Sequence, residues 1–234
     1  MTGKLFGIGV GPGDPELITI KAVRYIRKSD VIFLPAATRE ECYAYEIASH
    51  VIPDIASKEI VCKIFPMTRD KEKLAAARKD IFAAAASFIY KGKNVAFLTI
   101  GDPTIYSTCA YIHKQAVAEG IESVMINGVP SFCAVAATLG ISLADSSQEI
   151  HIIPGSYDVR ETMELGGTRV YMKSGKKLAE LKEALEEAPE RENLEIYAVS
   201  NCGMPNEKIT RGLERLETDS GYLTVVIIKE GVTN

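Results

Sequence analysis

The sequence predicts an α/β protein of two domains, the first built on a mainly parallel sheet and the second on a mixed sheet. Apolar segments of strand length alternate with amphipathic helical segments through the first half of the 234-residue chain. This alternation changes after the Asn-Gly-Val-Pro stretch at 127–130, beyond which the strands have one amphipathic helix, 176–187, among them. We therefore expect a first domain at 1–127 and a second at 131–234.

The first 35 residues justify the parallel sheet. A strand over 4–10 leads into the loop Gly11–Pro15, and a helix then runs to Lys28 with Asp14 as its N-cap. The apolar run 30–34 forms the next strand and Pro35 ends it. A strand, a crossover helix and a second strand in this order form a parallel unit.

The remaining elements follow from apolar periodicity and from Gly and Pro punctuation. The pattern predicts helices over 36–56, 70–90, 106–119, 131–139 and 176–187, and strands over 59–65, 94–100, 122–126, 149–153, 167–173, 194–200 and 222–229.

Composition excludes several classes of protein. Lys and Arg number 27 against 31 Asp and Glu, and this mildly acidic balance argues against a nucleic-acid partner. No apolar run reaches the roughly 18 residues of a membrane span, and the N-terminus is too short and too interrupted by Gly for a signal peptide. The cysteines form no CxxC pair and the histidines no HExxH pattern, which argues against a bound metal. We therefore expect a cytoplasmic protein without a metal site.

The glycine-rich loop after the first strand, Gly7–Asp14, invites comparison with a dinucleotide-binding fingerprint. The third glycine of GxGxxG would fall on Pro12 or on Asp14, depending on the starting glycine. The second strand ends in Leu34-Pro35, without the acidic residue that binds a ribose. The dinucleotide interpretation fails, and the segment is either a different ligand loop or a simple tight turn.

A second loop repeats this arrangement. The strand 94–100 runs into Gly101, Asp102 and Pro103, and a predicted helix follows. Gly101 would let a ligand approach the backbone, whereas Asp102 would either accept from a ligand or cap the helix. Both loops leave the carboxyl ends of parallel strands, where open α/β sheets bind ligands, so we expect them to share one cleft.

These two loops also carry a family resemblance. GVGPGDPELITIKA (9–22) together with LTIGDPTIYST (98–108) resembles the tetrapyrrole methylases, the S-adenosylmethionine-dependent methyltransferases of corrin and sirohaem synthesis. GVPSFCAVAATLGISLA (128–144) is similar to the branch that methylates C20 of precorrin-2 or cobalt-factor II in cobalamin (vitamin B12) biosynthesis. The resemblance implies a homodimer, with the cofactor in a cleft between two α/β domains and S-adenosylhomocysteine as product.

Alternative functions stay open beside this resemblance. Within the family they are methylation of another corrin ring carbon, of uroporphyrinogen III or of rRNA ribose, and diphthine synthesis. Outside it, the chain would be a nucleotide-binding α/β module without enzymatic activity.

The resemblance also implies a set of site residues. Those that would bind the cofactor are Pro12, Gly101, Asp102, Ile105, Ser107, Thr108, Ser131, Phe132, Met172, Asn201 (or its neighbour Ser200) and Thr224. The stretch after Ser200 matches the family pattern only loosely. Tyr106 is the candidate for removing the proton from C20. Simple structural roles compete with some of these assignments, such as core packing for Met172 and helix capping for Ser131.

A tetrapyrrole acceptor carries many carboxylates, so an acidic chain must bind it with local basic groups. The candidates are Arg39, Lys63, Arg69, Arg160, Lys173, Lys176 and Lys177. A solvated charged face is the alternative role for each of them.

Overall fold

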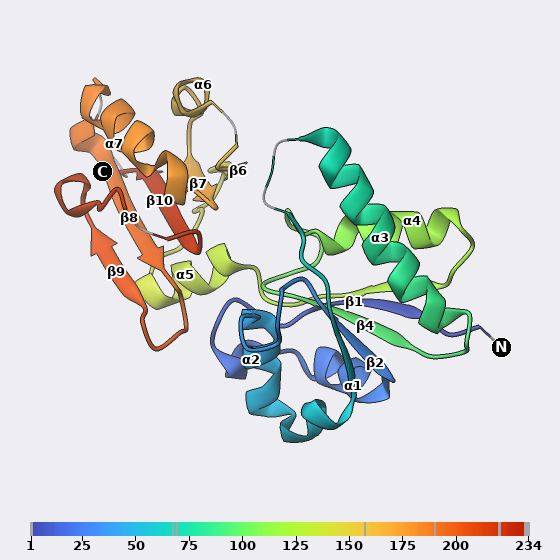
Figure 1. Cartoon of the computed structure of the whole chain (residues 1–234). Coiled ribbons are helices and arrows are strands. Elements are labelled where there is room, and N and C mark those ends of the chain that lie inside the picture. The colour runs from blue at the N-terminus through green and yellow to red at the C-terminus, as the bar shows by residue number, and fades with distance from the viewer. Residues whose placement is uncertain are drawn as a thin grey trace. The chain divides into compact units, whose positions relative to one another are not determined.

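A computed structural model describes residues 2–66, 68, 70–156, 158–189, 191–219 and 221–231, and at Lys176 the backbone alone. The chain divides into two compact units, Met1–Pro130 and Ser131–Asn234 (Figure 1). Each unit contains one sheet.

The first unit is a parallel sheet in the strand order β3-β2-β4-β1-β5, with helices on both faces. Its elements in chain order are β1 (Leu5–Gly9), η1 (Pro15–Leu17), α1 (Ile20–Lys28), β2 (Val31–Leu34), α2 (Tyr43–Val51), η2 (Pro53–Ser57), β3 (Glu59–Cys62), α3 (Lys71–Ile89), β4 (Val95–Thr99), α4 (Cys109–Ala118) and β5 (Ser123–Ile126). The predicted parallel sheet is confirmed.

Two apolar layers hold this sheet between its helices. Phe6 and Ile8 of β1 belong to the layer formed with α1 and α2, while Leu5 belongs to the layer formed with α3 and α4. Figure 1 shows these two pairs of helices on opposite faces of the sheet. β1, β2 and β4 are buried on both faces, which explains why their sequences are continuous apolar runs rather than alternating ones.

The helix expected from Asp14 to Lys28 is in fact two helices. The Asp14 carboxylate accepts from the Glu16 N–H at 2.9 Å and starts η1, which ends at Leu17. Ile18 is extended, and the Thr19 hydroxyl then caps α1 by accepting from the Ala22 N–H at 3.0 Å. Two capping side chains five residues apart start two helices.

Two further helix predictions are corrected. The helical stretch expected over 36–56 resolves into α2 and η2, separated by Ile52. The helix expected from Tyr106 begins only at Cys109, because Tyr106 has φ of +46°, a left-handed conformation that no right-handed helix contains.

The second unit is a mixed sheet in the order β6-β7-β10-β8-β9, in which β6 and β7 are parallel and the other neighbours antiparallel. Its elements are α5 (Ser131–Leu139), β6 (Ile150–Pro154), α6 (Val159–Met163), β7 (Thr168–Met172), η3 (Gly175–Lys177), α7 (Leu178–Glu187), η4 (Arg191–Asn193), β8 (Leu194–Ser200), β9 (Lys208–Arg211), η5 (Leu213–Arg215) and β10 (Thr224–Glu230). The expected mixed sheet is confirmed, whereas α6 and β9 were not predicted because each is short and has at most one buried residue.

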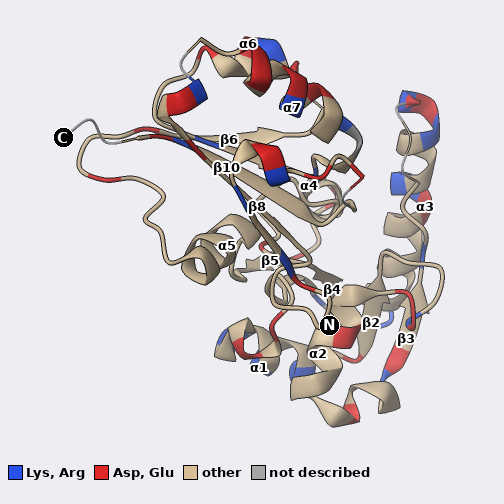
Figure 2. Cartoon of the chain, turned by 90° about the vertical axis from the view of Figure 1, so that its left-hand side faces the viewer, with Lys and Arg blue, Asp and Glu red and all other residues tan. Residues whose placement is uncertain are grey.

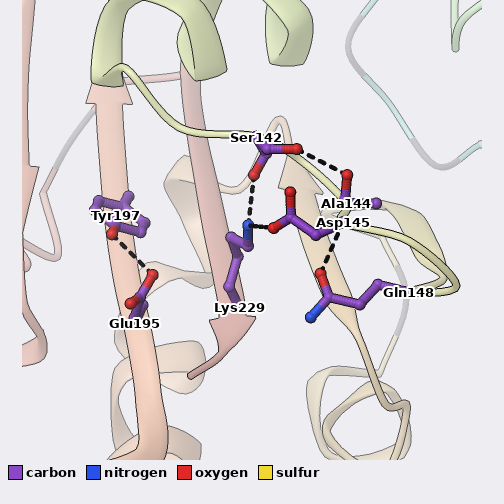
Figure 3. Close-up of polar contacts among 7 residues, drawn as sticks. All are labelled: Ser142, Ala144, Asp145, Gln148, Glu195, Tyr197 and Lys229. Carbon is purple, nitrogen blue, oxygen red and sulfur yellow. Dashed lines mark hydrogen bonds and ion pairs between the residues drawn. The ribbon is translucent and has the colours of Figure 1, made fainter. Parts of the chain in front are cut away.

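A buried lysine ties the segment between α5 and β6 to the sheet. Lys229 of β10 is 7% exposed, and its Nζ donates to the Ser142 carbonyl at 2.6 Å and lies 3.4 Å from Oδ2 of Asp145 (Figure 3). The Gln148 side chain accepts from the Asp145 N–H, which closes this segment into a compact loop. The ammonium therefore replaces lost water with a carbonyl and a carboxylate.

Charges of both signs lie along α3 and α7 (Figure 2). Among the described residues, no helix is long and apolar enough to cross a membrane.

Candidate functional site

The two glycine-rich loops predicted from the sequence lie side by side. The Gly101 N–H donates to the Gly11 carbonyl at 2.7 Å, and the Gly11 N–H donates back to the Gly101 carbonyl at 3.3 Å. β1 and β4 are parallel neighbours, so their carboxyl ends bring these loops to one edge of the sheet. The expected juxtaposition of the loops is confirmed.

The loop after β5 joins them at very close range. A Cβ atom on Gly9 would lie 2.4 Å from the Gly101 carbonyl oxygen, and one on Gly128 would lie 2.2 Å from the same oxygen. Both distances are shorter than any real Cβ contact, so glycine is required at both positions. These glycines let three pieces of backbone pack together.

The Asp102 carboxylate connects these loops by hydrogen bonds. Its Oδ2 accepts from the Gly128 N–H at 3.1 Å and from the Asn127 amide at 3.2 Å, while Oδ1 accepts from the Thr104 N–H at 2.8 Å and from the Thr104 hydroxyl at 2.5 Å. The residue is 5% exposed. The helix-capping alternative is wrong, because α4 starts seven residues later. The sequence did not lead us to Thr104 and Asn127 as partners of Asp102, although an Asp followed two residues later by Thr indicates a local turn.

The rest of the second loop is anchored at its far end. The Ser107 hydroxyl accepts from the Cys109 N–H at 3.2 Å and lies 3.0 Å from the Thr99 hydroxyl. Ser107 is buried and Thr108 occupies the N-cap position of α4 without a side-chain cap. Between these anchors, Thr104 and Tyr106 are exposed and Ile105 is half-buried. In the first loop, Pro12 is buried.

Tyr106 is the strained residue of this loop. Its φ of +46° is a conformation that Gly and Asn favour and that an aromatic residue adopts at a cost. The side chain is 41% exposed. Residues held in such conformations cluster at active sites, so the strain supports a functional interpretation of Tyr106.

The second unit gathers another group of predicted residues. Met172 ends β7 opposite Val225, and Thr224, the first residue of β10, pairs with Ser200. The Thr224 and Ser200 hydroxyls lie 2.9 Å apart. Asn201 follows with φ of +52° and donates its N–H to the Leu223 carbonyl. These residues therefore share one edge of the mixed sheet.

Ser131 and Phe132 form the first turn of α5, with Phe132 buried and Ser131 half-buried. The predicted cofactor residues thus belong to separate groups: Pro12, Gly101, Asp102, Ile105, Ser107 and Thr108 in the first unit, and Ser131, Phe132, Met172, Asn201 and Thr224 in the second.

Several of the basic candidates pair with carboxylates. The ion pairs are Arg39 with Glu40 at 2.7 Å, Lys63 with Asp80 at 2.8 Å, Arg160 with Glu187 at 3.0 Å and Lys177 with Glu180 at 3.2 Å. The hydrogen bond from Arg39 lowers the pKa of the Glu40 carboxyl. Lys173 Nζ lies 5.6 Å from the ring centroid of Tyr222. Arg69 and the Lys176 side chain lie outside the described residues.

Metal chemistry has no candidate in the described ranges, where no group of three or more His, Cys, Asp or Glu side chains converges.

Burial raises the pKa of Tyr171, and burial together with the Glu195 carboxylate raises the pKa of Tyr197 (Figure 3). Both phenols therefore lose their proton less readily than an ordinary tyrosine does.

Comparison with known proteins identifies the family. The model of the Tetrapyrrole (Corrin/Porphyrin) Methylases matches residues 4–216. The probable cobalt-precorrin-2 C(20)-methyltransferase of Methanocaldococcus jannaschii is 34% identical over 97% of this chain and 96% of its own, and the precorrin-2 C(20)-methyltransferase of a Sinorhizobium species is 27% identical over 97% and 95%. The solved structure of uroporphyrin-III C-methyltransferase from Thermus thermophilus with S-adenosylhomocysteine has the same fold, with a TM-score of 0.69 at 20% identity over 97% of this chain and 98% of that one. The chain belongs to the tetrapyrrole (corrin/porphyrin) methylases.

Proposed function

We propose that this chain transfers a methyl group from S-adenosylmethionine to C20 of precorrin-2 or of its cobalt complex, in cobalamin biosynthesis. The observation that carries the proposal is the similarity to two relatives whose names specify that carbon. Each comparison covers nearly all of this chain and nearly all of the relative. One of these names includes cobalt and the other does not, so both forms of the acceptor belong to the proposal.

Each unit has predicted cofactor residues at one end of its sheet, and their chemistry suits S-adenosylmethionine. In the first unit, Gly101 and Asp102 are occupied by contacts within the protein, so their role is to support the exposed part of the loop. Ile105 is half-buried and Tyr106 is exposed, and we propose that these two residues of the loop contact the ligand. In the second unit, the Ser200–Thr224 hydroxyl pair and the Met172 side chain suit a nucleoside with polar edges and an apolar face.

When bound, S-adenosylmethionine supplies a methyl group on a sulfonium, which already has a good leaving group. The protein's main task is then to hold the acceptor carbon in line with that methyl, and positioning of this kind supplies up to roughly 7–11 kcal/mol. We propose that the Tyr106 hydroxyl, held by its strained backbone, accepts the proton released from C20 while it gives its own phenolic proton to water.

Methylation assays with alternative acceptors test the proposed function. The purified chain is incubated with labelled S-adenosylmethionine and with precorrin-2, cobalt-loaded precorrin-2 or uroporphyrinogen III, and the products are located by mass spectrometry and NMR. Methylation at C20 of either precorrin form supports the proposal. Methylation of uroporphyrinogen III alone, or of none of the three, contradicts it.

The family resemblance also supports a homodimer that works in the cytoplasm. Sedimentation equilibrium of the purified chain tests the first part: a monomer at assay concentration contradicts it.

A further inference from the structure

Lys173, the residue directly after β7, has an unusual backbone. Its φ of +57° is a left-handed conformation that glycine adopts without cost and lysine does not. The segment that follows β6 holds it there. The Gly155 N–H donates to the Met172 carbonyl at 2.7 Å, and a Cβ on Gly155 would lie 2.5 Å from the Lys173 carbonyl oxygen. The end of β6 thus packs directly against the Lys173 peptide.

This backbone directs the ammonium to a defined place. Lys173 Nζ lies 5.6 Å from the centroid of the Tyr222 ring, within the range of a cation–π contact. Tyr222 is 47% exposed and stands two residues before Thr224. The cation therefore lies at the same edge of the sheet as Met172, Thr224 and Asn201.

We propose that Lys173 is a specificity-determining residue that binds a peripheral carboxylate of the tetrapyrrole acceptor. The inference rests on the proposed function, because it takes a polycarboxylate as the substrate. The chain carries a net charge of −4, so a polyanion must be bound by cations concentrated at its site. An ammonium held over an aromatic ring on a fixed backbone is such a group, and it loses little freedom on binding.

The alternative is that Lys173 only occupies a turn. A turn with φ above zero is more stable with glycine, because glycine removes the strain. Both roles predict that Lys173→Gly raises the thermal stability, because glycine relieves the positive φ. They differ in acceptor affinity, which is unchanged if Lys173 is only a turn residue and falls if Lys173 binds the acceptor.

The test compares Lys173→Gly and Lys173→Gln with Lys208→Gln as a matched control, since Lys208 belongs to the same unit and pairs with Glu217 at 2.5 Å on the surface. Three quantities are measured: Tm, the Kd for S-adenosylhomocysteine by calorimetry, and the Kd for uroporphyrin III, a stable polycarboxylate porphyrin, by fluorescence titration. The KM for the methyl acceptor is added where turnover is observed.

We expect both Lys173 variants to bind uroporphyrin about tenfold more weakly, with a matching rise in acceptor KM and an unchanged Kd for S-adenosylhomocysteine. The difference from wild type should shrink as salt is raised, because a partly exposed ion pair is screened. The Lys173→Gly variant should also melt at a higher temperature than wild type.

Two results overturn the inference: unchanged uroporphyrin affinity in both Lys173 variants, or a loss that falls on S-adenosylhomocysteine instead. The inference and the proposed function fail separately. Wild-type turnover at C20 with unaltered acceptor KM in the variants rejects the role of Lys173 alone. Uroporphyrin binding that depends on Lys173, in a protein that methylates no acceptor, rejects the C20 activity alone.

Discussion

The Asp102 carboxylate accepts a hydrogen bond from the backbone N–H of Gly128 at 3.1 Å and so joins the loop after β4 to the loop after β5. The same carboxylate accepts from Asn127 and, through its other oxygen, from Thr104. It is the polar centre of the edge where the three loops of the first unit meet.

We expect Asp102→Asn to destabilise the protein. The amide nitrogen of asparagine would face two donors, Gly128 N–H and Asn127, and hydrogen bonds to a charged group contribute about 1.5–3 kcal/mol. A loss of about 2 kcal/mol corresponds to a fall in Tm of roughly 4–8 °C for a chain of this size. Thermal melting measures it, with exposed Asp219→Asn as the control. Equal melting temperatures in the two variants would show that these bonds contribute nothing.

Gly128→Ala should be far more harmful than Gly221→Ala. A Cβ on Gly128 would lie 2.2 Å from the Gly101 carbonyl oxygen, whereas one on Gly221 meets nothing within 4 Å. Forced overpacking costs about 1–3 kcal/mol, and the displaced Gly101 loop should also weaken S-adenosylhomocysteine binding. Calorimetry and melting of both variants check this. Wild-type affinity in Gly128→Ala would separate the loop edge from the cofactor site.

Two substitutions of Tyr106 separate strain from chemistry. Tyr106→Phe keeps the ring and removes the hydroxyl, so a lost proton acceptor should lower kcat by about 100-fold or more while leaving the Kd for S-adenosylhomocysteine unchanged. Tyr106→Gly relieves the positive φ and should raise the unfolding free energy by about 1 kcal/mol. Unchanged kcat in the phenylalanine variant would reject Tyr106 as the proton acceptor.

Lys229→Met should loosen the loop between α5 and β6. The change leaves the Ser142 carbonyl without the 2.6 Å donor and removes the contact with Asp145, at a cost of about 1–3 kcal/mol. Hydrogen exchange over 140–148 should accelerate. Surface Lys208→Met is the matched control, because exposed ion pairs contribute about 0–1 kcal/mol. Equal exchange rates over 140–148 in the two variants would show that the contacts of Lys229 do not hold this loop.

The Cys109 thiol should make stability depend on alkaline pH. Burial raises its pKa from 9.0 to about 12, so the folded chain keeps a proton that the unfolded chain loses. Its contribution is complete below pH 9 and is lost as pH rises toward 12, at about 1.4 kcal/mol per unit. Denaturant titrations at several pH values in this window give the unfolding free energy. It should fall less steeply with pH in Cys109→Ala than in the exposed-site variant Cys133→Ala. Parallel slopes would contradict the assignment.

The sequence by itself determined the parallel sheet of the first unit and the mixed sheet of the second, because apolar period and length are local properties of the chain. The sequence also predicted that two glycine loops follow parallel strands, and their motifs indicated the family. Only the structure showed that these two strands are neighbours. The residues at which the helices begin were harder to predict from the sequence. Asp14 and Thr19 both cap helices, and only the backbone decided that the chain makes two helices there instead of one.

Tertiary structure alone decided what the loop residues do. The sequence allowed Asp102 to be a helix cap or a ligand contact. The structure shows instead that it accepts hydrogen bonds from Asn127 and Gly128, 25 and 26 residues away in the chain. The hydroxyl pair of Ser200 and Thr224 and the ring beneath Lys173 depend in the same way on strand register across β7, β8 and β10. Register fixes which distant side chains meet, and no local pattern in the sequence records it.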